Sequence, residues 1–113
     1  MTKGKVVLVS FPFDDLAAAK VRPAVCLTEP VGMHRHVVLA FITSRSPDDA
    51  VDTDVRLEPT HPDFSATGLR LPSTLRTHRL MTASTSLIRR ELGELSPAFR
   101  SQVTGKLRTL FGL

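Results

Sequence analysis

Short runs of β-branched and apolar residues, recurring through the first half of the chain, constrain its fold more than any other feature. They cover residues 6–11, 23–27 and 36–42, and turn residues bound each run. Runs of this length and composition are typical of strands. Because the runs are nearly continuous in hydrophobicity, we expect burial on both faces, as in a small barrel or a tightly curled sheet.

The segments that follow give weaker signals for further strands. Residues 54–58 alternate between apolar and charged side chains, which predicts a strand with one solvated face. Residues 69–82 fit one or two strands around Pro72, and residues 86–92 fit either a strand or a helical turn.

A helix is predicted near the end of the chain. Ser96 can cap it, Pro97 suits the first helical position, and Gly112 ends it. The apolar residues that recur at helical spacing are Phe99, Val103, Leu107, Leu110 and Phe111. Gly105 lowers the intrinsic stability of this helix, so we expect its apolar stripe to pack on the sheet. The sequence therefore predicts a mainly β fold with a C-terminal α-helix.

Length and charge limit the class of protein. With 113 residues, 42% of them apolar, the chain fits a single domain spanning residues 1–113. Its 15 Lys and Arg against 11 Asp and Glu give a net charge of +4, which favours anionic partners. Cys26 is the lone cysteine and sits in an apolar run, where a small buried hydrophobe fits at least as well as a nucleophile. No apolar stretch is long enough to cross a membrane, and we expect a cytoplasmic protein.

The strongest functional candidates are an arginine and a threonine at strand ends. Pro23 favours an extended conformation in Arg22, whose guanidinium would project from the start of a strand. Thr43 closes the next predicted strand. A permanent cation beside a hydroxyl suits the charge of a phosphate, so a nucleic-acid backbone is the expected ligand. The alternatives are a surface cation at Arg22 and a hydroxyl at Thr43 that caps a turn.

Further residues extend this candidate site. Lys20 and Arg45 add positive charge near the pair, and Ser44 adds a second hydroxyl, so we expect an anion groove. Phe13 could stack on a base of single-stranded RNA or pack inward with Phe11.

A second basic cluster covers residues 75–79. Strand alternation would place Arg76 and His78 on one face, where they could meet a common ligand, although a structural role for the histidine fits as well. The other histidines have no cysteine nearby and no ligand spacing, so we expect no metal site and no cofactor.

Several segments together resemble the PemK/MazF family of toxins. They are GKVVLV at 4–9, FPFD at 11–14, RPAV at 22–25 and ITS at 42–44, and the likeness continues through residues 68–95. This resemblance implies a small SH3-like β-barrel with a C-terminal α-helix, and a homodimer. It also implies metal-independent, sequence-specific cleavage of single-stranded RNA, restrained by a cognate antitoxin.

By resemblance, Arg22 and Thr43 take the catalytic positions, and the product would be a 2′,3′-cyclic phosphate with a 5′-hydroxyl. The expected RNA-binding residues are Phe13, Lys20, Ser44, Arg45, Arg76 and His78. Some family members carry an acidic residue where this chain has His78, and imidazole could replace it because it titrates near neutral pH. Two other functions fit the same fold: a non-enzymatic topoisomerase (gyrase) inhibitor and a catalytically silent RNA-binding module.

Overall fold

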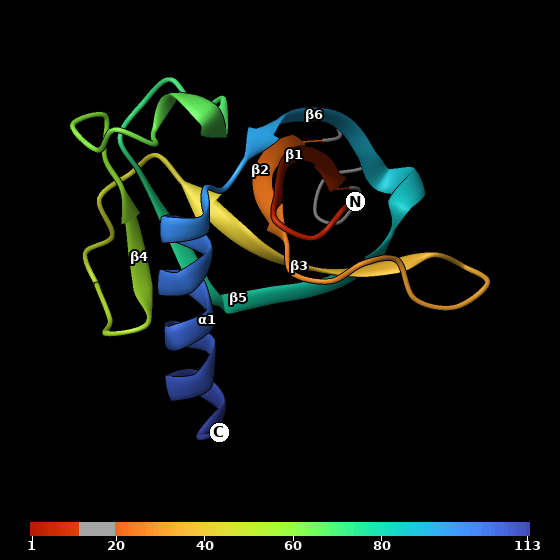
Figure 1. Ribbon diagram of the computed structural model, residues 1–113. Helices are drawn as coiled ribbons and strands as arrows, with labels where there is room; N and C mark the ends of the chain where they lie inside the picture. The colour runs from red at the N-terminus through yellow and green to blue at the C-terminus, as the bar shows by residue number, and fades with distance from the viewer. Residues whose placement is uncertain (12–19) are drawn as a thin grey trace.

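The computed structural model describes residues 1–11 and 20–113. Within these residues the chain forms strands, two short 3-10 turns and an α-helix (Figure 1). The elements are β1 (Lys5–Phe11), β2 (Lys20–Cys26), β3 (His36–Thr43), β4 (Asp54–Leu57), η1 (Ser65–Thr67), β5 (Ser73–Ser84), η2 (Thr85–Leu87), β6 (Ile88–Glu94) and α1 (Pro97–Phe111).

The strands form one antiparallel sheet in the order β4-β5-β3-β2-β1-β6. In Figure 1 the strands β1, β2 and β6 curl tightly, while α1 lies beside β4 and β5. Among the described residues β4 and β6 remain the two edges of the sheet. The predicted mainly β fold with a C-terminal helix is thus confirmed, and its barrel is a curled sheet that stays open.

Apolar side chains cover both faces of this sheet, as the unbroken hydrophobic runs predicted. The cluster that includes the helix contains Val6, Val25, Ala40, Ile42, Val55, Leu57, Phe64, Leu75, Leu95, Phe99 and Val103. The cluster on the other face contains Val7, Val9, Ala24, Cys26, Val37, Leu39 and Ala83. Neighbouring residues such as Val6 and Val7 therefore belong to different cores, which explains why the runs do not alternate with polar residues.

The helix α1 forms as its sequence predicts. The Ser96 side chain accepts a hydrogen bond from the Phe99 backbone N–H at 3.2 Å, and Gly112 ends the helix in the left-handed conformation. Phe99 and Val103 are buried and anchor the helix to the sheet. In the described part of the chain, no helix is both long enough and apolar enough to span a membrane.

The structure also resolves the two ambiguous segments. Residues after Pro72 form the single long strand β5, and the segment around residue 86 is a 3-10 turn followed by β6. The pairing of β3 with β5 is interrupted, because Ala40 lies opposite Leu80 while Phe41 lies opposite Arg76. Residues 77–79 fall in this irregularity, which changes the course of β5 beside the candidate site.

Candidate active site

A groove of about 470 Å³ lies where β2 begins and β3 ends. Three segments line it: the start of β2, the end of β3 with the residues after it, and the residues just before β5. The lining includes the three arginines Arg22, Arg45 and Arg70 and, among the described residues, no carboxylate. Such a groove suits an anionic ligand.

Arg22 and Thr43 come from adjacent antiparallel strands. Ala24 pairs with Phe41, and continuing this register by two residues places Arg22 opposite Thr43. Residues directly opposite each other in an antiparallel pair project from the same face. Arg22 is exposed and forms no ion pair with any residue that the structure describes. With respect to the described residues, its guanidinium is therefore available to an anion in the groove that Thr43 also lines.

The Thr43 side chain has a local partner. Its Oγ1 accepts a hydrogen bond from the backbone N–H of Arg45 at 3.2 Å, which is the turn-capping contact that the sequence left open. A hydroxyl that accepts one hydrogen bond still carries a proton to donate. Capping and contact with a phosphate are therefore compatible at Thr43.

Of the other predicted site residues, two line the groove and two have side chains outside the described part of the chain. Ser44 and Arg45 are exposed and line it. Lys20 begins β2 opposite Phe11, but its side chain lies outside the described part of the chain. Phe13 also lies outside the described residues.

Arg76 and His78 do not line the groove. Arg76 is only 8% exposed and forms ion pairs with Asp49 and Asp54, whereas His78 is exposed. The interrupted pairing of β5 after Arg76 explains why simple alternation does not relate the two side chains. Contact of either residue with RNA stays a prediction.

One wall of the groove, formed by Arg70 and Leu71, was not predicted from the sequence. Close backbone contacts bring this wall into place. A Cβ atom on Gly93 would collide with the Ala66 carbonyl, and one on Gly68 would collide with the Leu92 carbonyl. The only signal in the sequence was a basic residue beside an apolar one, and nothing local placed it beside Arg22.

Two other features carry no site chemistry. Burial raises the pKa of the Cys26 thiol to about 11, with smaller contributions from Glu29 and Glu91, so the thiol is protonated at neutral pH. In the ranges 1–11 and 20–113, no group of three or more His, Cys, Asp and Glu side chains could hold a metal ion.

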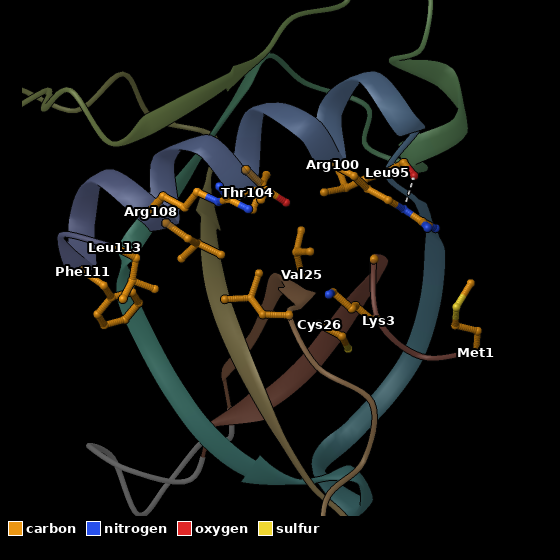
Figure 2. A pocket seen from close by; sticks show the side chains of 14 residues that line it. Met1, Lys3, Val25, Cys26, Leu95, Arg100, Thr104, Arg108, Phe111 and Leu113 are labelled. Carbon is orange, nitrogen blue, oxygen red and sulfur yellow. Dashed lines mark hydrogen bonds between the residues drawn. The ribbon is translucent and has the colours of Figure 1, made fainter.

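A second hollow, of about 600 Å³, lies between α1, the residues before β1 and the end of β2 (Figure 2). Its lining is mostly apolar and includes Phe111 and Leu113, which are exposed. Arg100 spans one end, where its Nε donates to the Leu95 carbonyl at 3.0 Å. None of the predicted catalytic or RNA-binding side chains that the structure describes lines this hollow.

Residues 2–111 match the family described as PemK-like, MazF-like toxin of type II toxin-antitoxin system. No curated protein matches the sequence.

Solved structures share the fold at low sequence identity. A MazE-MazF complex from Deinococcus radiodurans has a TM-score of 0.75 at 19% identity, covering 100% of this chain and 96% of the other. The Mycobacterium tuberculosis toxin MazF-mt6 has a TM-score of 0.72 at 21% identity, covering 96% and 97%. A mycobacterial endoribonuclease in complex with its cognate antitoxin has a TM-score of 0.72 at 19% identity, covering 100% and 96%.

Proposed function

Because this chain belongs to the family of PemK-like, MazF-like toxins of type II toxin-antitoxin systems, whose members are sequence-specific endoribonucleases, we propose that it cleaves single-stranded RNA in the groove containing Arg22 and Thr43. The observation that carries the proposal is that Arg22 and Thr43 line the same groove. Arg22 forms no ion pair with the described residues, Thr43 adds a hydroxyl, and no described carboxylate lines the groove. This arrangement suits the charge that develops on a phosphate during cleavage.

The proposed reaction is a transesterification within the RNA strand. The 2′-hydroxyl oxygen attacks the adjacent phosphorus, and the bond from phosphorus to the 5′-oxygen breaks. A 2′,3′-cyclic phosphate and a 5′-hydroxyl result, with the 2′-hydroxyl proton lost to a base and one proton supplied to the leaving oxygen. Arg22 stabilises the added negative charge on the phosphate, and Thr43 donates its hydroxyl proton to a non-bridging oxygen. Arg45 and Arg70 would hold neighbouring phosphates.

The proposal includes a homodimer restrained by a cognate antitoxin in the cytoplasm. Fold relatives solved as complexes with an antitoxin support the partner. The exposed Phe111 and Leu113 beside the second hollow support association with another protein surface. An antitoxin that covers Arg22, Arg45 and Arg70 should present acidic side chains, because it must compete with a polyanion.

The test uses purified wild-type protein and the variant Arg22→Ala with a long single-stranded RNA in excess EDTA, and new 5′ ends are mapped by primer extension. Arg89→Ala is the matched control, since Arg89 is exposed on β6 and outside the groove. Discrete cuts by the wild type and by Arg89→Ala, but not by Arg22→Ala, support the proposal. A folded wild type that binds RNA without cutting it, or an Arg22→Ala variant that cuts normally, contradicts it.

A further inference from the structure

Arg76 lies on β5, close to Thr43 on the neighbouring strand β3. Thr43 pairs with Thr74, and the next residue on the same face of β5 is Arg76, which lies opposite Phe41 on β3 and Asp54 on β4. Diagonal neighbours of this kind have Cα atoms about 7–8 Å apart. Arg76 is therefore close enough to influence the candidate site, although it does not line the groove.

The guanidinium of Arg76 is directed at Asp49, in the loop between β3 and β4, and at Asp54, the first residue of β4. Its Nη1 donates to Asp49 Oδ1 at 2.9 Å, its Nη2 to the Asp49 backbone carbonyl at 3.0 Å, and its Nε to Asp54 Oδ1 at 3.1 Å. The hydrogen bond from Arg76 is the main reason that the pKa of Asp49 lies below its usual range. Each of the three guanidinium nitrogens therefore donates to a different oxygen, in two ion pairs and one hydrogen bond to a backbone carbonyl.

The contacts of Arg76 with Asp49 and Asp54 form a clamp, and neighbouring hydrogen bonds extend it. The second carboxylate oxygen of Asp54 accepts from the Val51 backbone N–H at 3.2 Å. The Thr77 hydroxyl donates to the Thr53 carbonyl at 2.8 Å. The far end of the loop between β3 and β4, residues 44–53, is therefore tied to β5 by several bonds.

The near end of the same loop carries groove residues. It starts after Thr43, whose Oγ1 accepts from the Arg45 N–H, and Ser44 and Arg45 line the groove. We propose that Arg76 is a positioning residue for RNA cleavage: its clamp on Asp49 and Asp54 holds loop 44–53 so that Ser44 and Arg45 stay in the groove. This inference rests on the proposed function.

Burial makes direct binding of RNA by Arg76 costly. The side chains of Arg76 and Asp54 are 10% and 8% exposed, so moving the guanidinium to a phosphate would leave a buried carboxylate without its counter-charge. The clamp also neutralises two acidic groups that would otherwise repel RNA beside the groove.

The first measurement is hydrogen exchange of the backbone amides of residues 44–52, without RNA, in wild type, Asp49→Asn and Asp48→Asn. Asp48 is the matched control because it is exposed, is a neighbour of Asp49 and has no hydrogen bond or ion pair with the described residues. We expect Asp49→Asn to speed exchange about tenfold relative to Asp48→Asn. Equal exchange rates in both variants would contradict the proposal that the clamp holds the loop.

The second measurement separates kcat from KM for cleavage of single-stranded RNA by the same variants and by Arg76→Lys. If Arg76 positions the loop, Asp49→Asn and Arg76→Lys both lower kcat about tenfold, because lysine keeps the charge but loses the separate donor nitrogens of the guanidinium. If Arg76 instead binds RNA, Asp49→Asn frees the guanidinium and KM falls without a loss of kcat, which overturns the inference.

The two measurements also separate this inference from the function on which it rests. A folded wild type that does not cleave RNA overturns both the function and the positioning role, while hydrogen exchange still reports whether the clamp exists. Asp49 has a side chain that is 77% exposed, so Asp49→Asn should fold, and the result does not depend on the buried arginine tolerating substitution.

Discussion

The hydroxyl of Thr43 caps the turn that carries Arg45, through a hydrogen bond of 3.2 Å from the Arg45 backbone N–H. The same residue lines the groove together with Arg22, and extending the register of the Ala24 and Phe41 pair by two residues puts the two opposite each other. One side chain thus orients the loop and presents a donor to the groove. This coupling makes the threonine sensitive both to loss of its hydroxyl and to changes in the loop.

Two substitutions of Thr43 should distinguish the contribution of its hydroxyl to RNA cleavage from that of its side-chain shape. Thr43→Val keeps the branched shape and should lower the single-turnover rate of RNA cleavage by about 10²-fold or more, because the donor to the phosphate is lost. Thr43→Ser keeps the hydroxyl and should stay within about tenfold of wild type. Rates for Thr43→Val within threefold of wild type would contradict a catalytic role.

Replacing Arg70 should weaken RNA binding without slowing chemistry. Arg70 lines the groove outside the Arg22 and Thr43 pair, so we expect Arg70→Gln to raise KM and leave kcat nearly unchanged. Loss of one phosphate contact should reduce the slope of log K against log salt by about 0.7. The control is Arg89→Gln, which removes an exposed cation outside the groove. Equal slopes for both variants would place Arg70 away from the RNA.

The fold could be predicted because its signals are local. Each hydrophobic run is a strand, and Ser96, Pro97 and Gly112 mark the ends of the helix by the cap contacts that the structure contains. The start of β2 was placed too late, because Lys20 and Val21 lack the continuous apolar pattern that identified the rest of the strand.

The site was less predictable because distant residues build it. Arg22 and Thr43 could be found from strand ends, and the groove contains both. Arg70 could not, because backbone packing of η1 on β6 brings it there. The burial of Arg76 depends on carboxylates 22 and 27 residues away, so a basic cluster in the sequence gave no sign that its arginine was already paired.

A methyl group at residue 93 should disturb this packing. In Gly93→Ala the new Cβ would collide with the Ala66 and Thr67 backbone, which cannot move like the end of a side chain. We expect a loss of about 1–3 kcal/mol in the free energy of unfolding, measured by urea denaturation. Gly105→Ala is the control, because its Cβ would meet nothing within 4 Å, and alanine in a helix should add up to about 1 kcal/mol. A Gly93→Ala variant as stable as wild type would contradict the close contact.

The Cys26 thiol should make stability depend on alkaline pH. Burial is the main cause that raises its pKa to about 11 in the folded protein, whereas the unfolded thiol titrates at its ordinary value near 9. Above that value the unfolded state loses the proton first, so folding loses stability as pH rises toward 11. Between pH 8 and pH 10 wild type should lose about 1 kcal/mol more of its free energy of unfolding than Cys26→Ala does. Urea denaturation at both pH values measures this difference. Comparing the two proteins cancels the contributions to the free energy of unfolding from groups that titrate in both. Parallel losses would show that the thiol ionises as readily in the folded state as in the unfolded state.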